Sequence, residues 1–289
     1  MKLILSEEQQ FLKDTAQSFA RDKTPTTHFR KLRDDENTKC WDDSIWQEMV
    51  QLGWSGILVP EEFGGSDFGI AGISVIMQEL GKTLTPSPML ATSVLGVSAI
   101  KLLGSNEQKK IYLPKIVSGE TTTALAIDEG NHHNPFDIEA TATLEGDKWT
   151  LNGQKVFIID GASADFILIV ARTSGEKGES NGLSVFIADK NSKGLEVSQI
   201  STADCRNYAN LIMNNLILDE NALLGEVDIA GKVIEQVLDL ERIAMASEML
   251  GNTGEAFEIT VSYLKERRQF GVLIGSFQAL QHRAAKMFC

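Results

Sequence analysis

The spacing of apolar residues changes twice along this chain of 289 residues, and this change limits the folds open to it. Over about the first 119 residues apolar side chains recur every three or four positions, as in amphipathic helices. From about residue 120 to 226 they form short runs separated by Gly and Asn, as in consecutive β-strands. From about Ile229 the helical spacing returns and continues to Cys289. Because no helices alternate with the strands, a βαβ sheet is excluded.

This order predicts an α+β protein of several domains. We expect an N-terminal all-α domain over residues 1–119, a central antiparallel β-barrel or β-sandwich over 120–226, and a C-terminal α-helical bundle over 227–289. The last predicted helix reaches Cys289 without a C-terminal cap, so we expect this bundle to be incomplete.

Local signals support both kinds of segment. Ser6 with Gln9, and Ser105 with Gln108, have the spacing of capping boxes, which begin helices. The polar stretch 21–39 is expected to interrupt the helical pattern. Strands are predicted at Thr121–Ile127, Lys148–Ile159, Phe166–Arg172, Leu183–Asp189, Leu195–Ile200 and Leu211–Leu218, with turns that include Glu145-Gly146-Asp147 and Asn152-Gly153.

Charge, cysteine and histidine content narrow the classes of partner. With 40 acidic and 27 basic residues the formal net charge is −13, which disfavours nucleic acid and anionic membrane surfaces. Cys40, Cys205 and Cys289 are too widely spaced for a disulfide framework or a metal motif. His132 and His133 lie in a Gly/Asn/Pro loop without a third ligand, so we interpret them as solvated turn residues and expect no metal site.

No segment has the pattern of a signal peptide or a membrane span, so we expect a cytoplasmic protein.

Glu241 is the most informative ionisable residue. Ile234, Leu238 and Met245 flank it at helical spacing, so it lies in an apolar stripe. Burial there would raise the pKa of the carboxyl group and suit it to act as a general base near neutral pH. The alternative is a partly exposed glutamate at the edge of the stripe, beside Arg242, and the residues alone favour this alternative.

The segment 265–271 places two arginines beside Phe270. Guanidinium groups bind phosphate and an aromatic ring packs on an apolar body, so the segment suits an anionic, planar ligand. The alternative is the end of a helix at which the arginines bind the last carbonyl groups.

Five stretches together resemble the acyl-CoA dehydrogenases, flavoproteins that oxidise acyl-CoA thioesters to 2-enoyl-CoA. They occur in the order typical of that family and extend over nearly the whole chain. The stretches are Leu52-Gly53-Trp54 with Pro60-Glu61-Glu62-Phe63-Gly64-Gly65, Leu113-Pro114-Lys115-Ile116-Val117-Ser118-Gly119-Glu120, Leu151-Asn152-Gly153-Gln154-Lys155, Leu238-Asp239-Leu240-Glu241-Arg242, and Arg267-Arg268-Gln269-Phe270-Gly271 with Phe277-Gln278-Ala279-Leu280-Gln281-His282.

The resemblance implies a reaction that depends on FAD. In this family a carboxylate removes the α-proton of the thioester, the β-hydrogen passes as hydride to the flavin, and electrons leave through an electron-transfer flavoprotein. Glu241 matches one of the two positions of that base, so the resemblance favours Glu241 as the catalytic base. It further implies an acyl-CoA substrate and a homo- or hetero-oligomer, a dimer or a tetramer. In that assembly Arg267, Gln269 and Phe270 contact the FAD of a neighbouring subunit.

The flavin loop departs from the pattern of the family. Ile127 and Asp128 stand where a Thr-Glu-Pro start is usual, and a carboxylate at Asp128 would repel an anionic reduced flavin by about 1 kcal/mol or more unless protonated. Phe157 and Ile159 replace the ends of a Trp-Ile-Thr segment beside the flavin N5, which removes a hydroxyl donor. We expect these four residues to line the cofactor site, with weakened FAD binding or hydride transfer.

Two alternatives follow from these departures. One is a non-catalytic, heteromer-forming homologue that contributes its 267–270 edge to the active site of a partner. The other is an acyl-CoA-binding or hydroxylating relative with the same fold. The unfinished bundle implies that the chain is part of a longer product or that a partner covers its apolar face.

Overall fold

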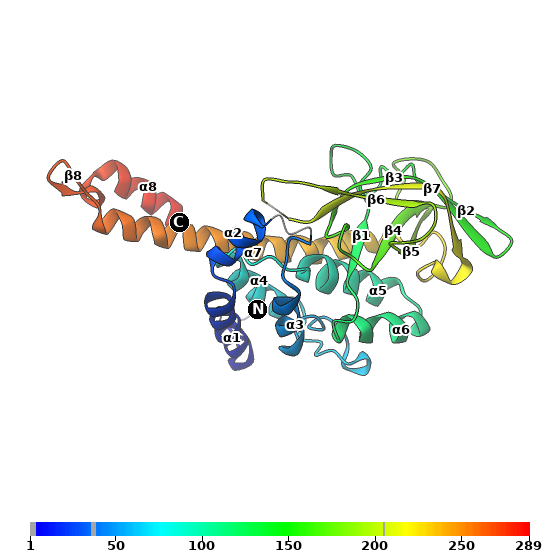
Figure 1. The fold of residues 1–289 in the computed structure, drawn as a ribbon, viewed down its shortest axis with the longest axis horizontal. Helices are drawn as coiled ribbons and strands as arrows, with labels where there is room; N and C mark the ends of the chain where they lie inside the picture. The colour runs from blue at the N-terminus through cyan, green and yellow to red at the C-terminus, as the bar shows by residue number, and fades with distance from the viewer. Residues whose placement is uncertain (1–3, 36–38, 205) are drawn as a thin grey trace.

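The computed structural model describes residues 4–35, 39–204 and 206–289. A group of helices lies against a curled β-sheet, and the long helix α7 (Gly231–Glu266) runs along both and then projects beyond them (Figure 1). Two further segments, β8 (Arg268–Gln269) and α8 (Gln278–Phe288), lie at the projecting end. The predicted order of helices, sheet and helices is therefore confirmed.

The N-terminal part consists of helices that begin at recognisable caps. Ser6 accepts the N–H of Gln9 at 3.2 Å, and Ser105 accepts the N–H of Gln108 at the same distance, so both capping boxes are confirmed. The elements are α1 (Glu7–Lys23), α2 (Thr26–Asp34), α3 (Asp43–Gln51), the 3₁₀-helix Glu61–Phe63, α4 (Ile70–Lys82), the π-helix Met89–Gly96, α5 (Val97–Leu103) and α6 (Asn106–Val117).

Helix α2 contradicts the expected interruption over residues 21–39. It forms nine residues of helix after Pro25, within the stretch that the sequence marks as irregular. None of its residues is fully buried, and Phe29 and Leu32 are its only large apolar side chains, too few for a helical period to be recognised.

The sheet is curled and mainly antiparallel, as predicted. Strand β4 is the exception, since it pairs in parallel with β1 and, at one position, with β2. The β2–β3 hairpin separates β1 from β4 in the chain, which allows both to run in the same direction. The strands are β1 (Thr123–Ala126), β2 (Thr141–Glu145), β3 (Lys148–Ile159), β4 (Phe166–Arg172), β5 (Leu183–Asp189), β6 (Leu195–Ile200) and β7 (Tyr208–Asp219).

Two local predictions in the sheet are wrong. Strand β2 is absent from the predicted strands because only Ala142 of its five residues is buried, so its sequence does not alternate. Asn152-Gly153 is a bulge inside β3, where the register with β7 shifts, and not a turn. At Gly153 φ is +137° and an added Cβ would lie 2.7 Å from the Cα of Ala140, so this position requires glycine.

The C-terminal part contains α7, the hairpin of β8 and β9 (Val272–Leu273), the 3₁₀-helix Ile274–Ser276 and α8. The first half of α7 buries Ile234, Leu238 and Ala244, whereas no residue after Gly251 is buried. Two helices make only part of a bundle, as expected. The domain boundaries after residues 119 and 226 remain predictions.

Helices α4 and α7 cross with their backbones in direct contact. An added Cβ on Gly81 would lie 2.2 Å from the carbonyl oxygen of Glu248, and one on Gly251 would lie 1.9 Å from that of Gln78. This double contact fixes the rotation of α7, and so the face of α7 that carries Glu241.

In the described part of the chain, no helix combines the length and apolar character needed to cross a membrane. Cys40 and Cys289 form no disulfide there, and Cys205 lies outside it.

Candidate active site

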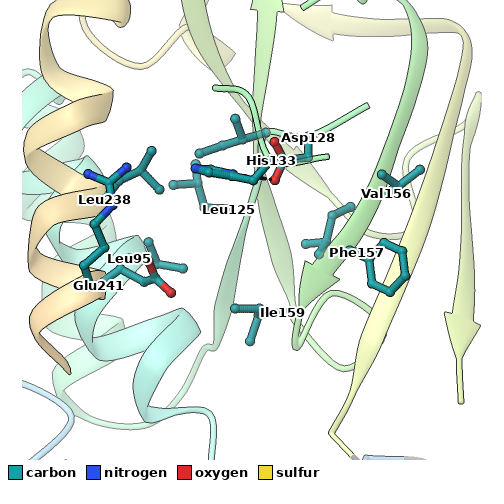
Figure 2. A pocket seen from close by; sticks show the side chains of 12 residues that line it. Leu95, Leu125, Asp128, His133, Val156, Phe157, Ile159, Leu238 and Glu241 are labelled. Carbon is teal, nitrogen blue, oxygen red and sulfur yellow. Dashed lines mark hydrogen bonds and ion pairs between the residues drawn. The ribbon is translucent and has the colours of Figure 1, made fainter. Parts of the chain in front are cut away.

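A cavity of about 290 Å³ lies between the sheet and α7. Figure 2 shows the carboxylate of Glu241 pointing from α7 into the space in front of β3, with Ile159 on the opposite side. The walls come from four segments of the chain, namely Leu95, Leu125, Ile127, Asp128, His133, Val156, Phe157, Ile158, Ile159, Leu238, Glu241 and Arg242.

The π-helix Met89–Gly96 supplies Leu95 and is fastened to β1. Thr92 donates its hydroxyl to the carbonyl of Thr123 and accepts the N–H of the same residue, both at 3.1 Å. Gly96 allows close packing, since a Cβ there would lie 2.0 Å from the Thr123 side chain. All eight residues of the π-helix are buried, so this wall of the cavity is rigid.

Glu241 is half-buried beside the apolar residues Leu238 and Ile159. Burial raises the pKa of its carboxyl group, while the nearby charges of His133 and Arg242 act in the opposite direction. Arg242 is directed along its own helix, at 2.7 Å from Asp239 and 3.3 Å from Glu235. Glu241 therefore combines features of both expected alternatives, a position at the edge of the stripe and a carboxyl group of raised basicity.

Asp128 closes the loop that follows β1. Its Oδ2 lies 2.9 Å from Nδ1 of His133, and its Oδ1 accepts the N–H of Asn134 at 3.1 Å. His133 is exposed in an irregular loop, as interpreted from the sequence, and it also lines the cavity, which was not predicted. His132 is exposed and lies outside the lining. Within the described ranges, no group of three or more His, Cys, Asp or Glu residues could hold a metal ion.

Lys155 holds the same loop from inside the protein. Its ammonium group has no exposed surface and lies 2.8 Å from the carbonyl oxygen of Ile127 and 2.7 Å from Oε1 of Glu129. Glu129 also accepts the N–H groups of Glu139 at 2.7 Å and Ala140 at 3.0 Å. Burial lowers the pKa of Lys155 to about 8, against the opposing charge of Glu129. Contacts between residues far apart in the chain leave no periodic pattern in the sequence, so this positioning role of Lys155 could not be predicted.

Phe157 and Ile159 lie differently although both line the cavity. Phe157 has φ of +52°, is 57% exposed, and its ring meets that of Tyr208 edge-on with centroids 6.2 Å apart. Figure 2 shows this ring turned away from Glu241. A register shift between Lys155 and Ile158 produces the difference. Ile159, and not Phe157, therefore faces the candidate base.

Arg267, Gln269 and Phe270 are not brought to this cavity. They lie in and beside the β8–β9 hairpin at the far end of α7 (Figure 1), where Phe270 is 90% exposed. Any contact between these residues and a ligand in such a cavity therefore requires a second subunit.

The lining suits a planar, largely apolar ring with a polar edge. Leu125, Ile127 and Ile159 supply flat apolar surface, and the Asp128–His133 pair supplies polar atoms along one side. A cleft with apolar walls and few polar groups is the usual form of a cofactor site. The residues present therefore fit the isoalloxazine ring of a flavin.

Three family descriptions match the chain in order: the acyl-CoA dehydrogenase N-terminal domain over residues 6–120, the middle domain over 126–219 and the C-terminal domain over 231–289. The mitochondrial isovaleryl-CoA dehydrogenase of Solanum tuberosum is 30% identical over 99% of this chain and 70% of its own length. Acryloyl-CoA reductase (NADH) of Anaerotignum propionicum is 29% identical over 99% of this chain and 73% of its own. The structure of butyryl-CoA dehydrogenase from Megasphaera elsdenii has a TM-score of 0.89 and 26% identity, covering 100% of this chain and 76% of that one. This chain belongs to the acyl-CoA dehydrogenase family.

Proposed function

We propose that this chain oxidises an acyl-CoA thioester to the 2-enoyl-CoA, with Glu241 as the base that takes the α-proton. The observation that carries the proposal is the half-buried carboxylate of Glu241, which points into an apolar cavity opposite Ile159 (Figure 2). Its raised pKa makes it a stronger base than an exposed glutamate.

FAD is the cofactor of this family, and when bound it would accept the β-hydrogen of the substrate as hydride. Ile127, Asp128 and Ile159 would hold the ring in this chain, with Phe157 at the outer edge of the cavity. Lys155 fixes the backbone of the cofactor loop through the carbonyl of Ile127.

The proposal includes a second subunit and an electron acceptor. The hairpin that carries Arg267, Gln269 and Phe270 is exposed and remote from the cavity of its own chain. We propose that it contacts the FAD of a neighbouring subunit in a dimer or a tetramer. An electron-transfer flavoprotein would then take the electrons from the reduced cofactor.

A second candidate is a non-catalytic homologue with weakened FAD binding, which Asp128 in the cofactor loop favours. The flavin absorbance of the purified chain separates the two candidates. A yellow protein obtained from the chain alone supports the enzyme. Colour that appears only after co-expression with a related subunit supports the second candidate.

The base is tested by Glu241→Gln. We expect dye reduction by acyl-CoA to fall by about 10²- to 10⁴-fold, the range for losing a general base, with bound flavin unchanged. Glu258→Gln is the matched control, since Glu258 is an exposed carboxylate on the same helix. Unchanged turnover in Glu241→Gln would reject this assignment.

A further inference from the structure

The loop between β1 and β2 contains a carboxylate whose two oxygens are both engaged. One oxygen of Asp128 lies 2.9 Å from Nδ1 of His133, and the other accepts the N–H of Asn134 at 3.1 Å. The two contacts join residues five and six positions apart, so they hold the imidazole ring in place. Asp128 is only 26% exposed at its side chain, which strengthens its hold on the ring.

His133 reaches from Asp128 toward α7 along the cavity wall (Figure 2). Because Nδ1 is directed at Asp128, Nε2 is the ring nitrogen left for a ligand. The charge of His133 also acts on Glu241 across the cavity, so the two side chains lie within electrostatic range. The ring is therefore oriented by a partner and directed at the same cavity as the candidate base.

The charges that face His133 come from three elements. Asp128 lies in its own loop, while Glu241 and Arg242 lie on α7. Arg242 is already paired with Asp239 and Glu235, which compensates its charge. Behind the loop, Lys155 of β3 is paired with Glu129. The carboxylates of Asp128 and Glu241 therefore remain as the charges that face the imidazole ring.

Resting on the proposed function, we propose that His133 binds the ring edge of FAD and is positioned for this by Asp128. A two-electron-reduced flavin carries negative charge on its ring at neutral pH, and charges beside the ring nitrogens set its affinity and potential. With Nδ1 donating to Asp128, Nε2 donates only when both ring nitrogens carry hydrogen, and its hydrogen bond to the ring then favours the reduced cofactor over the oxidised one. The carboxylate of Asp128 alone would repel the reduced ring. Here it orients His133, and the hydrogen bond from His133 compensates this repulsion.

The test is the ratio of the dissociation constants of oxidised and reduced FAD, obtained from the midpoint potential of the bound cofactor. His133→Gln keeps a hydrogen-bond donor for Asp128 and removes the imidazole ring from the cavity wall. We expect reduced FAD to lose about tenfold in affinity relative to oxidised FAD, which is a fall of about 30 mV for a two-electron couple. His132→Gln is the matched control, because this neighbouring histidine is exposed and outside the lining.

A double variant tests the positioning role. In Asp128→Asn/His133→Gln the negative charge of Asp128 is absent as well, so we expect part of the lost affinity for reduced FAD to return. An unchanged ratio in His133→Gln, with flavin bound normally, would overturn this inference and leave the proposed function intact. A change confined to acyl-CoA affinity would also overturn it. A wild-type chain that binds no flavin, alone or in a complex, would overturn both.

Discussion

Gly251 of α7 packs directly on the carbonyl group of Gln78 in α4, and a Cβ built on it would lie 1.9 Å from that oxygen. We predict that Gly251→Ala lowers the free energy of unfolding by about 1–3 kcal/mol, the usual cost of overpacking. Gly254→Ala is the matched control, since nothing lies within 4 Å of a Cβ there. It should stabilise the same helix by up to about 1 kcal/mol. Urea denaturation measures both, and equal effects would contradict the close crossing.

Removing Lys155 should destabilise the cofactor loop. Lys155→Met leaves the carboxylate of Glu129, 10% exposed at its side chain, without its cation, and breaking a buried pair costs about 3–5 kcal/mol. The double variant Lys155→Met/Glu129→Gln should recover part of the loss in urea denaturation. No recovery would mean that the ion pair is not the source of the effect.

The pH dependence of turnover should report Glu241. Burial raises the pKa of this base, so kcat/KM should fall as the pH decreases through an apparent pKa above that of an ordinary glutamate. Arg242 lowers the pKa of Glu241, and Arg242→Gln should therefore move this acid limb to higher pH. Arg283→Gln on α8 serves as the control. If the acid limb of the pH profile is the same in Arg242→Gln as in the wild type, a group other than Glu241 titrates.

Asp160 should make stability depend on pH. Burial raises the pKa of its carboxyl group to about 7, against the opposing charge of Arg206. The folded state then holds a proton that the unfolded state releases near pH 4, so stability falls as the pH rises from about 4 to 7. Asp160→Asn should remove this decline, and its advantage over the wild type should grow by a few kcal/mol between pH 4 and 8. Parallel unfolding curves of the two proteins across this range would contradict the prediction.

The proposed role of the hairpin predicts complementation between two inactive subunits. Glu241→Gln retains the hairpin, whereas Arg267→Ala retains the base. If the hairpin completes the cavity of a neighbour, co-expression of the two variants should restore part of the dye reduction. Each variant expressed alone is the control, and activity no greater than theirs would indicate that the hairpin does not act between subunits.

Much of the sheet could be predicted because its strands have apolar runs bounded by turn residues. The bounds of β4 and β5 agree with prediction, since these strands bury nearly every residue. Strand β2 and helix α2 were not predicted because neither buries enough apolar surface to produce a period.

The candidate site could be predicted where a side chain belongs to a periodic pattern or to a stretch that resembles the family, as Ile127, Asp128, Phe157 and Ile159 do. Glu241 was singled out because it lies in the stripe of Ile234 and Leu238, and the resemblance to the family then favoured it as the base. His133 was missed because its role depends on a contact with Asp128 across an irregular loop. Lys155 was missed because its partner Glu129 lies on a different segment, and no sequence period links the two.

The cavity walls come from the π-helix, the first strands of the sheet and α7, which are widely separated in the sequence. A chimera that exchanges one of these segments with a homologue would combine Leu95, Ile159 and Leu238 from different parents. Side chains that meet in one parent would then face unmatched partners, so the shape of the cavity in such hybrids would depend on how the parental segments meet.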